Sequence, residues 1–169
     1  MITPAYCVTM ARYNTWQNRQ IARAMDTLTD VELTRDRGAF FGSILGTANH
    51  ILWGDMMWMS RFGVGKPHES GIRDSTTLTP TAAVWYADRY RMDKRIELWA
   101  EKLHTVDLTG PLNWYSGAAE ADMSMPVGVC VTHMFNHQTH HRGQIHAMLT
   151  AAGVDPGATD LFLTPGLAD

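Results

Sequence analysis

The 169-residue chain contains little cysteine and few charged residues. Its two cysteines, Cys7 and Cys130, lie far apart, so there is no Cys-x-x-C motif for a thiolate zinc site or a thioredoxin-like redox site. We expect two free, buried thiols in a reducing compartment. Charged residues make up 18% of the chain, and its net charge is −3. That balance provides no basic surface for nucleic acid.

The chain also lacks a long apolar run. The longest candidate, residues 44–62, is interrupted by His50, Asp55 and Arg61, so no segment reaches the ~20 apolar residues of a membrane-spanning helix. The first residues show no basic segment followed by an apolar run, so we expect no signal peptide and a cytoplasmic protein. An apolar fraction of 45% excludes a disordered chain. The length predicts one domain over residues 1–169.

Four long segments have the apolar periodicity and the end signals of helices. They run from Thr3-Pro4 to about Leu28, from 43 to 62, from Thr79-Pro80 to about His104, and from 127 to 152, where Gly153 follows. Thr29 and Glu32 form a capping-box pattern that predicts a short helical turn between the first two segments. Charged residues of the third segment, among them Arg89 and Asp93, are interpreted as a solvated face.

Residues 111–126 differ from the rest of the chain because apolar and polar side chains alternate there. This pattern predicts a small β-hairpin with its turn at 117–120. The elements together predict an all-α fold, a four-helix bundle with the hairpin between its third and fourth helices. The 11 Met and 6 Trp residues are interpreted as bundle core. Residues 161–163, Leu-Phe-Leu, are expected to pack against the body of the protein.

Histidine is the unusual residue, because five of the eight lie between His133 and His146. At 100° per residue, His141 falls within the apolar face of the fourth helix and His137 at its edge. His133 and His140 fall on the flank, and His146 points away. Two histidines four residues apart lie side by side, as in metal sites on helices. The alternative is a pair of core imidazoles bonded to backbone or buried water.

A third ligand would have to come from another part of the chain. No acidic residue lies beside the histidine pair, which excludes the H-E-x-x-H peptidase motif. His50 shares its helix face with Gly46 and Gly54, although each glycine inside a helix costs about 1 kcal/mol relative to alanine. We expect these glycines to make room for a ligand at His50 or for close packing of another helix. Periodicity alone does not choose His50 over His68 or His104.

Two stretches carry a family resemblance: residues 47–55, Thr-Ala-Asn-His-Ile-Leu-Trp-Gly-Asp, and residues 133–144, His-x-x-x-His-x-x-His-His-Arg-Gly-Gln. Residues 13–16, Tyr-Asn-x-Trp, and 40–44, Phe-Phe-Gly-Ser-Ile, also match. They resemble the DinB (YfiT-like) superfamily of candidate metalloenzymes, and the resemblance covers essentially the whole chain. It implies an up-down-down-up bundle and a divalent metal ion, typically zinc or nickel.

In that superfamily one histidine of the second long helix and two of the fourth hold the ion. These positions match His50, His137 and His141. Three histidines leave at least one coordination position for water or substrate, as in catalytic zinc sites. Metal-bound water, or a substrate thiol held as thiolate, would then carry the chemistry. No further catalytic residue is identified from the sequence.

Two functions compete on this evidence. The first is a metal-dependent enzyme, a hydrolase or a thiol-dependent S-transferase, acting on a small molecule and with a low-molecular-weight thiol as one candidate partner. The alternative is a non-catalytic, metal-stabilised stress or interaction protein, whose site is closed by a fourth ligand such as His133 or Asp55. The apolar second helix and the resemblance favour a homodimer without nucleic-acid or membrane partners.

Six further polar residues remain as weaker candidates. Arg61 and Arg142 are interpreted chiefly as surface or bundle-end charges, with ligand binding as the alternative. Asn14 and Gln17 of the first helix are candidates to face the site. His140, Arg142 and Gln144 are candidates to orient the ligands or the neighbouring helices.

Overall fold

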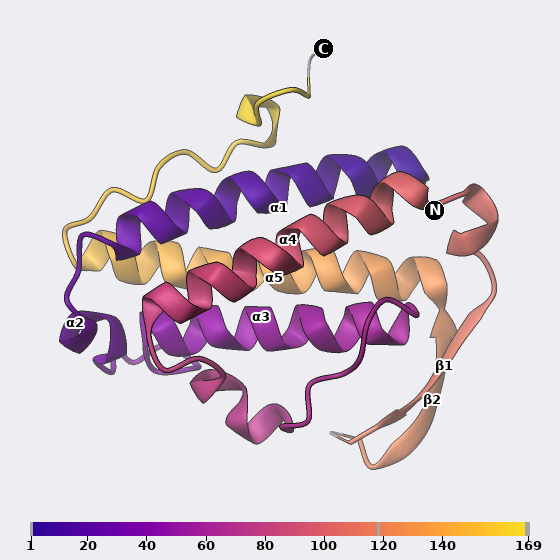
Figure 1. Ribbon diagram of the computed structural model, residues 1–169, viewed down its shortest axis with the longest axis horizontal. Coiled ribbons are helices and arrows are strands. Elements are labelled where there is room, and N and C mark those ends of the chain that lie inside the picture. The colour runs from indigo at the N-terminus through magenta and orange to yellow at the C-terminus, as the bar shows by residue number, and fades with distance from the viewer. Residues whose placement is uncertain (1, 118, 168–169) are drawn as a thin grey trace.

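The computed structural model describes residues 2–117 and 119–167. Four long helices form the bundle that the sequence predicts, in the up-down-down-up order that the resemblance implies (Figure 1). They are α1 (Pro4–Met25), α3 (Ile44–Arg61), α4 (Ala82–Lys102) and α5 (Val127–Ala151). Both α1 and α3 pack against α4 and α5, so the bundle core lies among the four helices. The short helix α2 (Asp30–Thr34) begins at the predicted capping box.

Hydroxyl side chains determine where three of the long helices begin. Thr3, Ser43 and Thr81 each accept a hydrogen bond from a backbone N–H of the first helical turn. The prediction that the third long helix starts at Thr79-Pro80 is therefore wrong by two residues. The Thr79 hydroxyl instead donates to Asn49 Oδ1 at 2.7 Å, which attaches the segment before α4 to α3.

The predicted hairpin is present between α4 and α5. Strands β1 (Pro111–Ser116) and β2 (Ala121–Pro126) are antiparallel, with Trp114 opposite Met123. The turn expected at 117–120 includes Ala118, which lies outside the described residues. Strand β1 brings Trp114 against Trp58 of α3, with the ring centroids 5.6 Å apart. The hairpin therefore contributes side chains beside α3 rather than extending away from the bundle.

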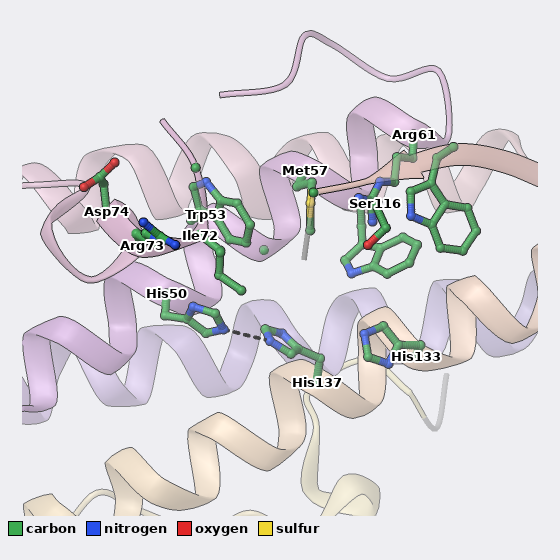
Figure 2. A pocket seen from close by; sticks show the side chains of 15 residues that line it. His50, Trp53, Met57, Arg61, Ile72, Arg73, Asp74, Ser116, His133 and His137 are labelled. Carbon is green, nitrogen blue, oxygen red and sulfur yellow. Dashed lines mark hydrogen bonds between the residues drawn. The ribbon is translucent and has the colours of Figure 1, made fainter. Parts of the chain in front are cut away.

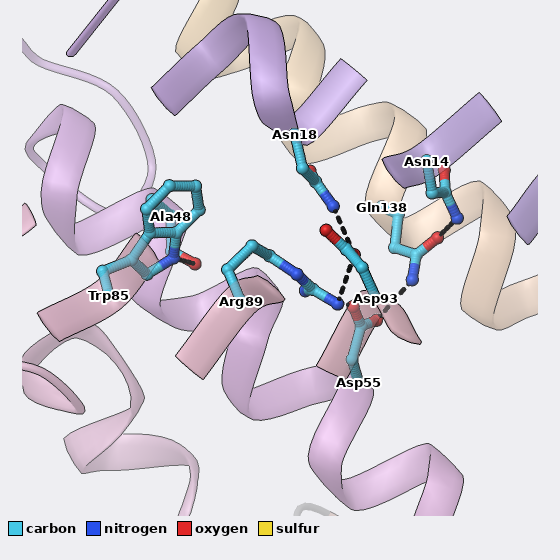
Figure 3. A network of polar contacts seen from close by, with 8 residues as sticks. All are labelled: Asn14, Asn18, Ala48, Asp55, Trp85, Arg89, Asp93 and Gln138. Atoms are coloured by element: carbon cyan, nitrogen blue, oxygen red, sulfur yellow. Dashed lines mark hydrogen bonds and ion pairs between the residues drawn. The ribbon is translucent and has the colours of Figure 1, made fainter. Parts of the chain in front are cut away.

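Part of the charged face predicted for α4 is buried. Arg89 and Asp93 are 1% and 4% exposed, and Arg89 lies 2.5 Å from Asp55 of α3 and 2.9 Å from Asp93 (Figure 3). The interpretation of these two residues as solvated was wrong, because their charges are neutralised inside the bundle. Breaking a buried ion pair from one side is strongly destabilising, so this network joins α3 to α4.

The same network extends to the other two long helices. Gln138 of α5 donates to Asp55 Oδ1 at 2.7 Å and accepts a hydrogen bond from Asn14 of α1. Asn18 of α1 donates to Asp93 at 2.9 Å. Burial raises the pKa of Asp93 to about 6, although the Arg89 cation opposes that shift. All four long helices thus share one polar cluster, which fixes their relative positions.

The C-terminal segment is held differently from the expectation. The predicted packing of residues 161–163 was wrong, because Leu161, Phe162 and Leu163 are 42%, 80% and 50% exposed. Backbone carbonyls earlier in the segment accept hydrogen bonds instead, from Tyr13 and Gln17 of α1. Polar side chains of the bundle therefore attach this segment, whereas residues 161–163 remain in solvent.

The remaining sequence expectations concern the core and membranes. Cys7 and Cys130 are buried and free, as predicted. Trp85 and Met59 are fully buried, in agreement with the interpretation of Trp and Met as core residues. Within the described part of the chain, no helix is both long and apolar enough to cross a bilayer.

Candidate metal centre

Two helices bring three histidines together in the bundle. His50 projects from α3, and His137 and His141 project from α5. One ring nitrogen of each lies within 4.8 Å of the other two, and the Nε2 atoms of His50 and His137 are 3.0 Å apart (Figure 2). Ligands that share one zinc ion at about 2.1 Å lie about 3 to 4 Å from one another. These three histidines, called the triad below, are close enough together to hold a metal ion.

Hydrogen bonds to the second ring nitrogens orient two of the triad rings. The Gln144 Oε1 oxygen can only accept, so His141 Nδ1 donates to it at 2.7 Å, and the lone pair is left on Nε2. The Ser75 hydroxyl lies 2.9 Å from His50 Nδ1. Such partners typically fix the tautomer of a metal-binding histidine. The donor set therefore fits a divalent ion, and Gln144 is one of the candidate orienting residues.

Ser75 was not predicted from the sequence. It lies in a 3-10 helix, Ile72–Thr77, within a loop that the sequence marks only by its Gly, Ser and Thr content. This short helix packs along α3, which places the Ser75 hydroxyl beside His50. A single serine in a loop has no periodic pattern, so no sequence signal could have selected it.

The structure shows which of the two purposes expected for the glycines of α3 applies at Gly54. A Cβ atom at Gly54 would lie 3.0 Å from Cε1 of His137, and one at Gly46 would lie 2.9 Å from the Phe41 carbonyl oxygen. Gly54 therefore makes room for the imidazole that α5 contributes. Of the two expected purposes, close packing of another helix is the one that the structure shows at Gly54.

Burial makes the triad a set of neutral imidazoles. Desolvation, with a smaller contribution from His141, lowers the pKa of His50 to about 4. Desolvation and the neighbouring histidines lower the pKa of His137 to about 3. The Phe41 ring stacks on His50 with the centroids 3.8 Å apart and contributes to this apolar setting. Metal ions bind the neutral form of histidine, so these rings need not lose a proton at neutral pH.

One side of the triad faces a cavity. A pocket of about 670 Å³ is lined by His50 and His137 together with side chains of α3, β1 and the loop after α3; we call it the triad pocket. His133 also lines it, and its ring centroid lies 5.8 Å from that of His137. Asp55 points instead to Arg89 and Gln138. Within the described residues, neither His133 nor Asp55 belongs to the close histidine group.

The weaker polar candidates separate into two groups in the structure. Asn14, Gln17 and Arg142 do not reach the triad, because Asn14 binds Gln138, Gln17 binds the C-terminal segment and Arg142 packs over the Tyr13 ring at 5.3 Å. The interpretation of Arg142 as a surface charge was wrong: it is 4% exposed, and burial lowers its pKa to about 10. Arg61 lines the triad pocket.

The flanking histidines also take the positions that the helical geometry predicts. His133 and His140 are exposed, while His146 is half-buried and its Nε2 atom lies 3.2 Å from the Gly157 carbonyl oxygen. The His140 ring contacts the edge of His141, with the centroids 4.8 Å apart. None of these three belongs to the close group of ring nitrogens.

The bundle and its buried histidines define a helical protein with a candidate metal centre between α3 and α5. The model of the DinB family matches residues 1–168, so the chain belongs to the DinB family. The protein DinB of Bacillus subtilis (strain 168) is 27% identical over 161 residues, which cover 90% of this chain and 91% of that protein.

A solved structure has the same fold. The crystal structure of a DinB-like protein from Bacillus cereus ATCC 10987 aligns with a TM-score of 0.64 at 20% identity. The alignment covers 85% of this chain and 91% of the other. At that level of identity the likeness shows the shared bundle, and the chemistry of this chain has to be argued from its own side chains.

Proposed function

We propose that the protein is a metal-dependent enzyme in which His50, His137 and His141 bind a divalent zinc or nickel ion. The observation that carries this proposal is that His50 and His137 belong to the close group of ring nitrogens and also line the triad pocket. An ion held there has a coordination side open to a cavity large enough for a small molecule. Three protein ligands and one open position are typical of catalytic zinc sites.

Residues around the triad would hold and cover its rings. Gln144 and Ser75 hold the rings of His141 and His50, and Phe41 covers His50. When bound, the ion would supply Lewis acidity, activating water for hydrolysis or holding a substrate thiol as thiolate for S-transfer. The apolar wall of the pocket would exclude bulk water from the reacting groups. A small-molecule substrate fits either reaction, and a low-molecular-weight thiol is a candidate partner in S-transfer.

Metal analysis and activity measurements test the proposal together. Protein purified without added metal should contain about one zinc or nickel ion per chain, and His50→Ala, His137→Ala and His141→Ala should each lose it. His104→Ala is the matched control, because His104 is an exposed histidine outside the triad. The loaded protein should turn over either aryl esters or a thiol together with an electrophilic acceptor. A full complement of metal in all three triad variants would refute the proposal.

A non-catalytic, metal-stabilised stress or interaction protein is the alternative function. It requires a fourth protein ligand, and Asp55, one candidate for that ligand, is held by Arg89 and Gln138. Asp55 is therefore not free to close the site, and the side of the triad that faces the triad pocket favours the enzyme. Metal that raises thermal stability without any turnover of esters or thiol adducts would favour the alternative.

We also propose that the protein is a cytoplasmic homodimer. The free thiols of Cys7 and Cys130 fit a reducing compartment, and the family resemblance favours the homodimer, whereas the apolar helix α3 is largely buried within its own bundle. A mass measurement in solution tests the oligomeric state, and fractionation of cells that express the protein tests its location.

A further inference from the structure

The lining side chains of the triad pocket extend to both sides of His50, and the two sides differ in their polar groups (Figure 2). Asp74 and Arg73 lie on one side of His50, and Arg61 and Ser116 lie on the other side, beyond Met57. All of these residues line the cavity. The position of the triad, the apolar stretch and the cationic end therefore follow one another along the pocket. Such an arrangement can orient a ligand as well as enclose it.

The wall between these ends is apolar and aromatic. Trp53 and Ile72 lie beside His50, Met57 lies between them and Arg61 (Figure 2), and Trp58 and Trp114 lie at Arg61. His133 links the two ends, because its ring centroid lies 5.1 Å from Trp58 and 5.8 Å from His137. Flat aromatic surfaces of this kind favour a ligand with a planar apolar body.

Arg61 is the unusual group of the pocket. Its guanidinium carbon lies 4.6 Å from the Trp58 ring centroid and 5.1 Å from that of Trp114, so the two indoles hold the cation in place. Within the described residues, no carboxylate lies within ion-pair distance of Arg61, whereas Arg89 contacts two. Burial lowers the pKa of Arg61, in keeping with a cation that lacks a protein partner. The guanidinium donors remain available to a ligand.

We propose that the triad pocket binds a small organic carboxylate with a planar apolar body, and that Arg61 is the residue that selects it. The carboxylate pairs with the guanidinium, whose parallel N–H groups match its two oxygens. The planar body lies along Trp53 and Met57 and directs the other end of the molecule to the triad. That last placement rests on the proposed metal-dependent function, whereas the carboxylate site on Arg61 does not.

Calorimetric titration with a matched pair of probes tests the proposal. The probes are 2-naphthoate and 2-naphthamide, which have the same planar body and differ in charge. Metal-free protein should bind the carboxylate at least about tenfold more tightly than the amide, as expected for a charge-assisted contact. Arg61→Met should abolish the preference by weakening carboxylate binding more than amide binding, and Arg61→Lys should retain only part of the preference. Arg19→Met, which removes an exposed charge of α1, is the control and should keep the preference.

The possible results separate this inference from the proposed function. Equal affinities for the two probes, no measurable binding of either, or a preference that survives Arg61→Met would overturn the carboxylate site. The preference could also appear only in zinc-loaded protein and be unchanged by Arg61→Met. The anion would then bind the metal, which would refute the carboxylate site on Arg61 and agree with the proposed enzyme. An Arg61-dependent preference in protein that binds no metal would support the carboxylate site and refute the proposed metal-dependent enzyme.

Discussion

Replacing Gly54 by alanine tests whether the position of the His137 ring determines metal binding. The added Cβ would lie 3.0 Å from His137 Cε1, whereas carbon atoms in contact are normally about 3.5 to 4.0 Å apart. The imidazole must therefore move by a few tenths of an ångström. Ligand distances in metal sites lie within about 0.2 Å of their usual values, so a shift of this size is expected to weaken the bond between His137 and the ion.

The expected result is a loss of metal affinity without a loss of folding. We expect Gly54→Ala to bind zinc at least about tenfold more weakly in a competition titration against a chromogenic chelator, because a displacement of this size removes much of one metal–ligand bond. The metal-free variant should be as stable as the parent or more stable, by up to about 1 kcal/mol, because alanine is the better helix former. A urea denaturation of the chelated protein measures this second quantity.

Gly143 of α5 provides the matched control. It also lies inside a helix, but a Cβ there would meet no atom within 4 Å. Gly143→Ala should therefore gain the same helix propensity and bind zinc like the parent. Parent-like zinc affinity in Gly54→Ala would refute the reasoning, because it would mean that the ring of His137 need not occupy the space that Gly54 leaves.

Three further predictions concern stability. Chelation should lower the free energy of unfolding of metal-loaded protein by about 2.7 kcal/mol where the free ion had been at 100 times its Kd, and an unchanged melting temperature would argue against a bound ion. The pKa of His137 is about 3 in the folded protein, against about 6.5 for an unperturbed histidine, so between these two pH values the unfolded chain binds a proton that the folded, metal-free protein does not. Metal-free parent should therefore lose stability relative to His137→Gln as pH falls from 6.5 towards 3, with no difference in slope above 6.5; parallel pH profiles would contradict this. Asp55→Asn should cost about 3 kcal/mol in urea denaturation because it leaves Arg89 short of a buried partner, whereas Asp88→Asn, at an exposed pair, should cost under about 1 kcal/mol.

The long helices and the hairpin could be predicted because their signals are local. Thr3 and Ser43 are helix-capping residues, and Gly153, with a φ of +80°, follows the end of α5. Alternation along residues 111–126 identified the two strands. The start of α4 was misjudged because Thr79 and Thr81 are equally good caps by sequence, and the choice between them depends on the contact of Thr79 with Asn49 of α3.

The polar core shows where local signals fail. Arg89 and Asp93 follow the pattern of a solvated helix face, yet they are buried because Asp55 of a distant segment lies opposite them. Charge alone predicts exposure, since an unpaired charge is costly to bury. Burial of Arg89 and Asp93 can be predicted only if Asp55 is known to lie opposite them, and that depends on how the helices pack.

The amino-acid sequence by itself determined the helices of this protein, and the spacing of His137 and His141 placed them side by side on one helical face. Tertiary structure alone brought His50 to that pair, put Ser75 behind it and left Gly54 beneath the ring of His137. It also enclosed Arg61 between two indoles at the end of the triad pocket. The physical reason is range: capping and periodicity act within a few residues, whereas these sites join segments that are close together only after the bundle has packed.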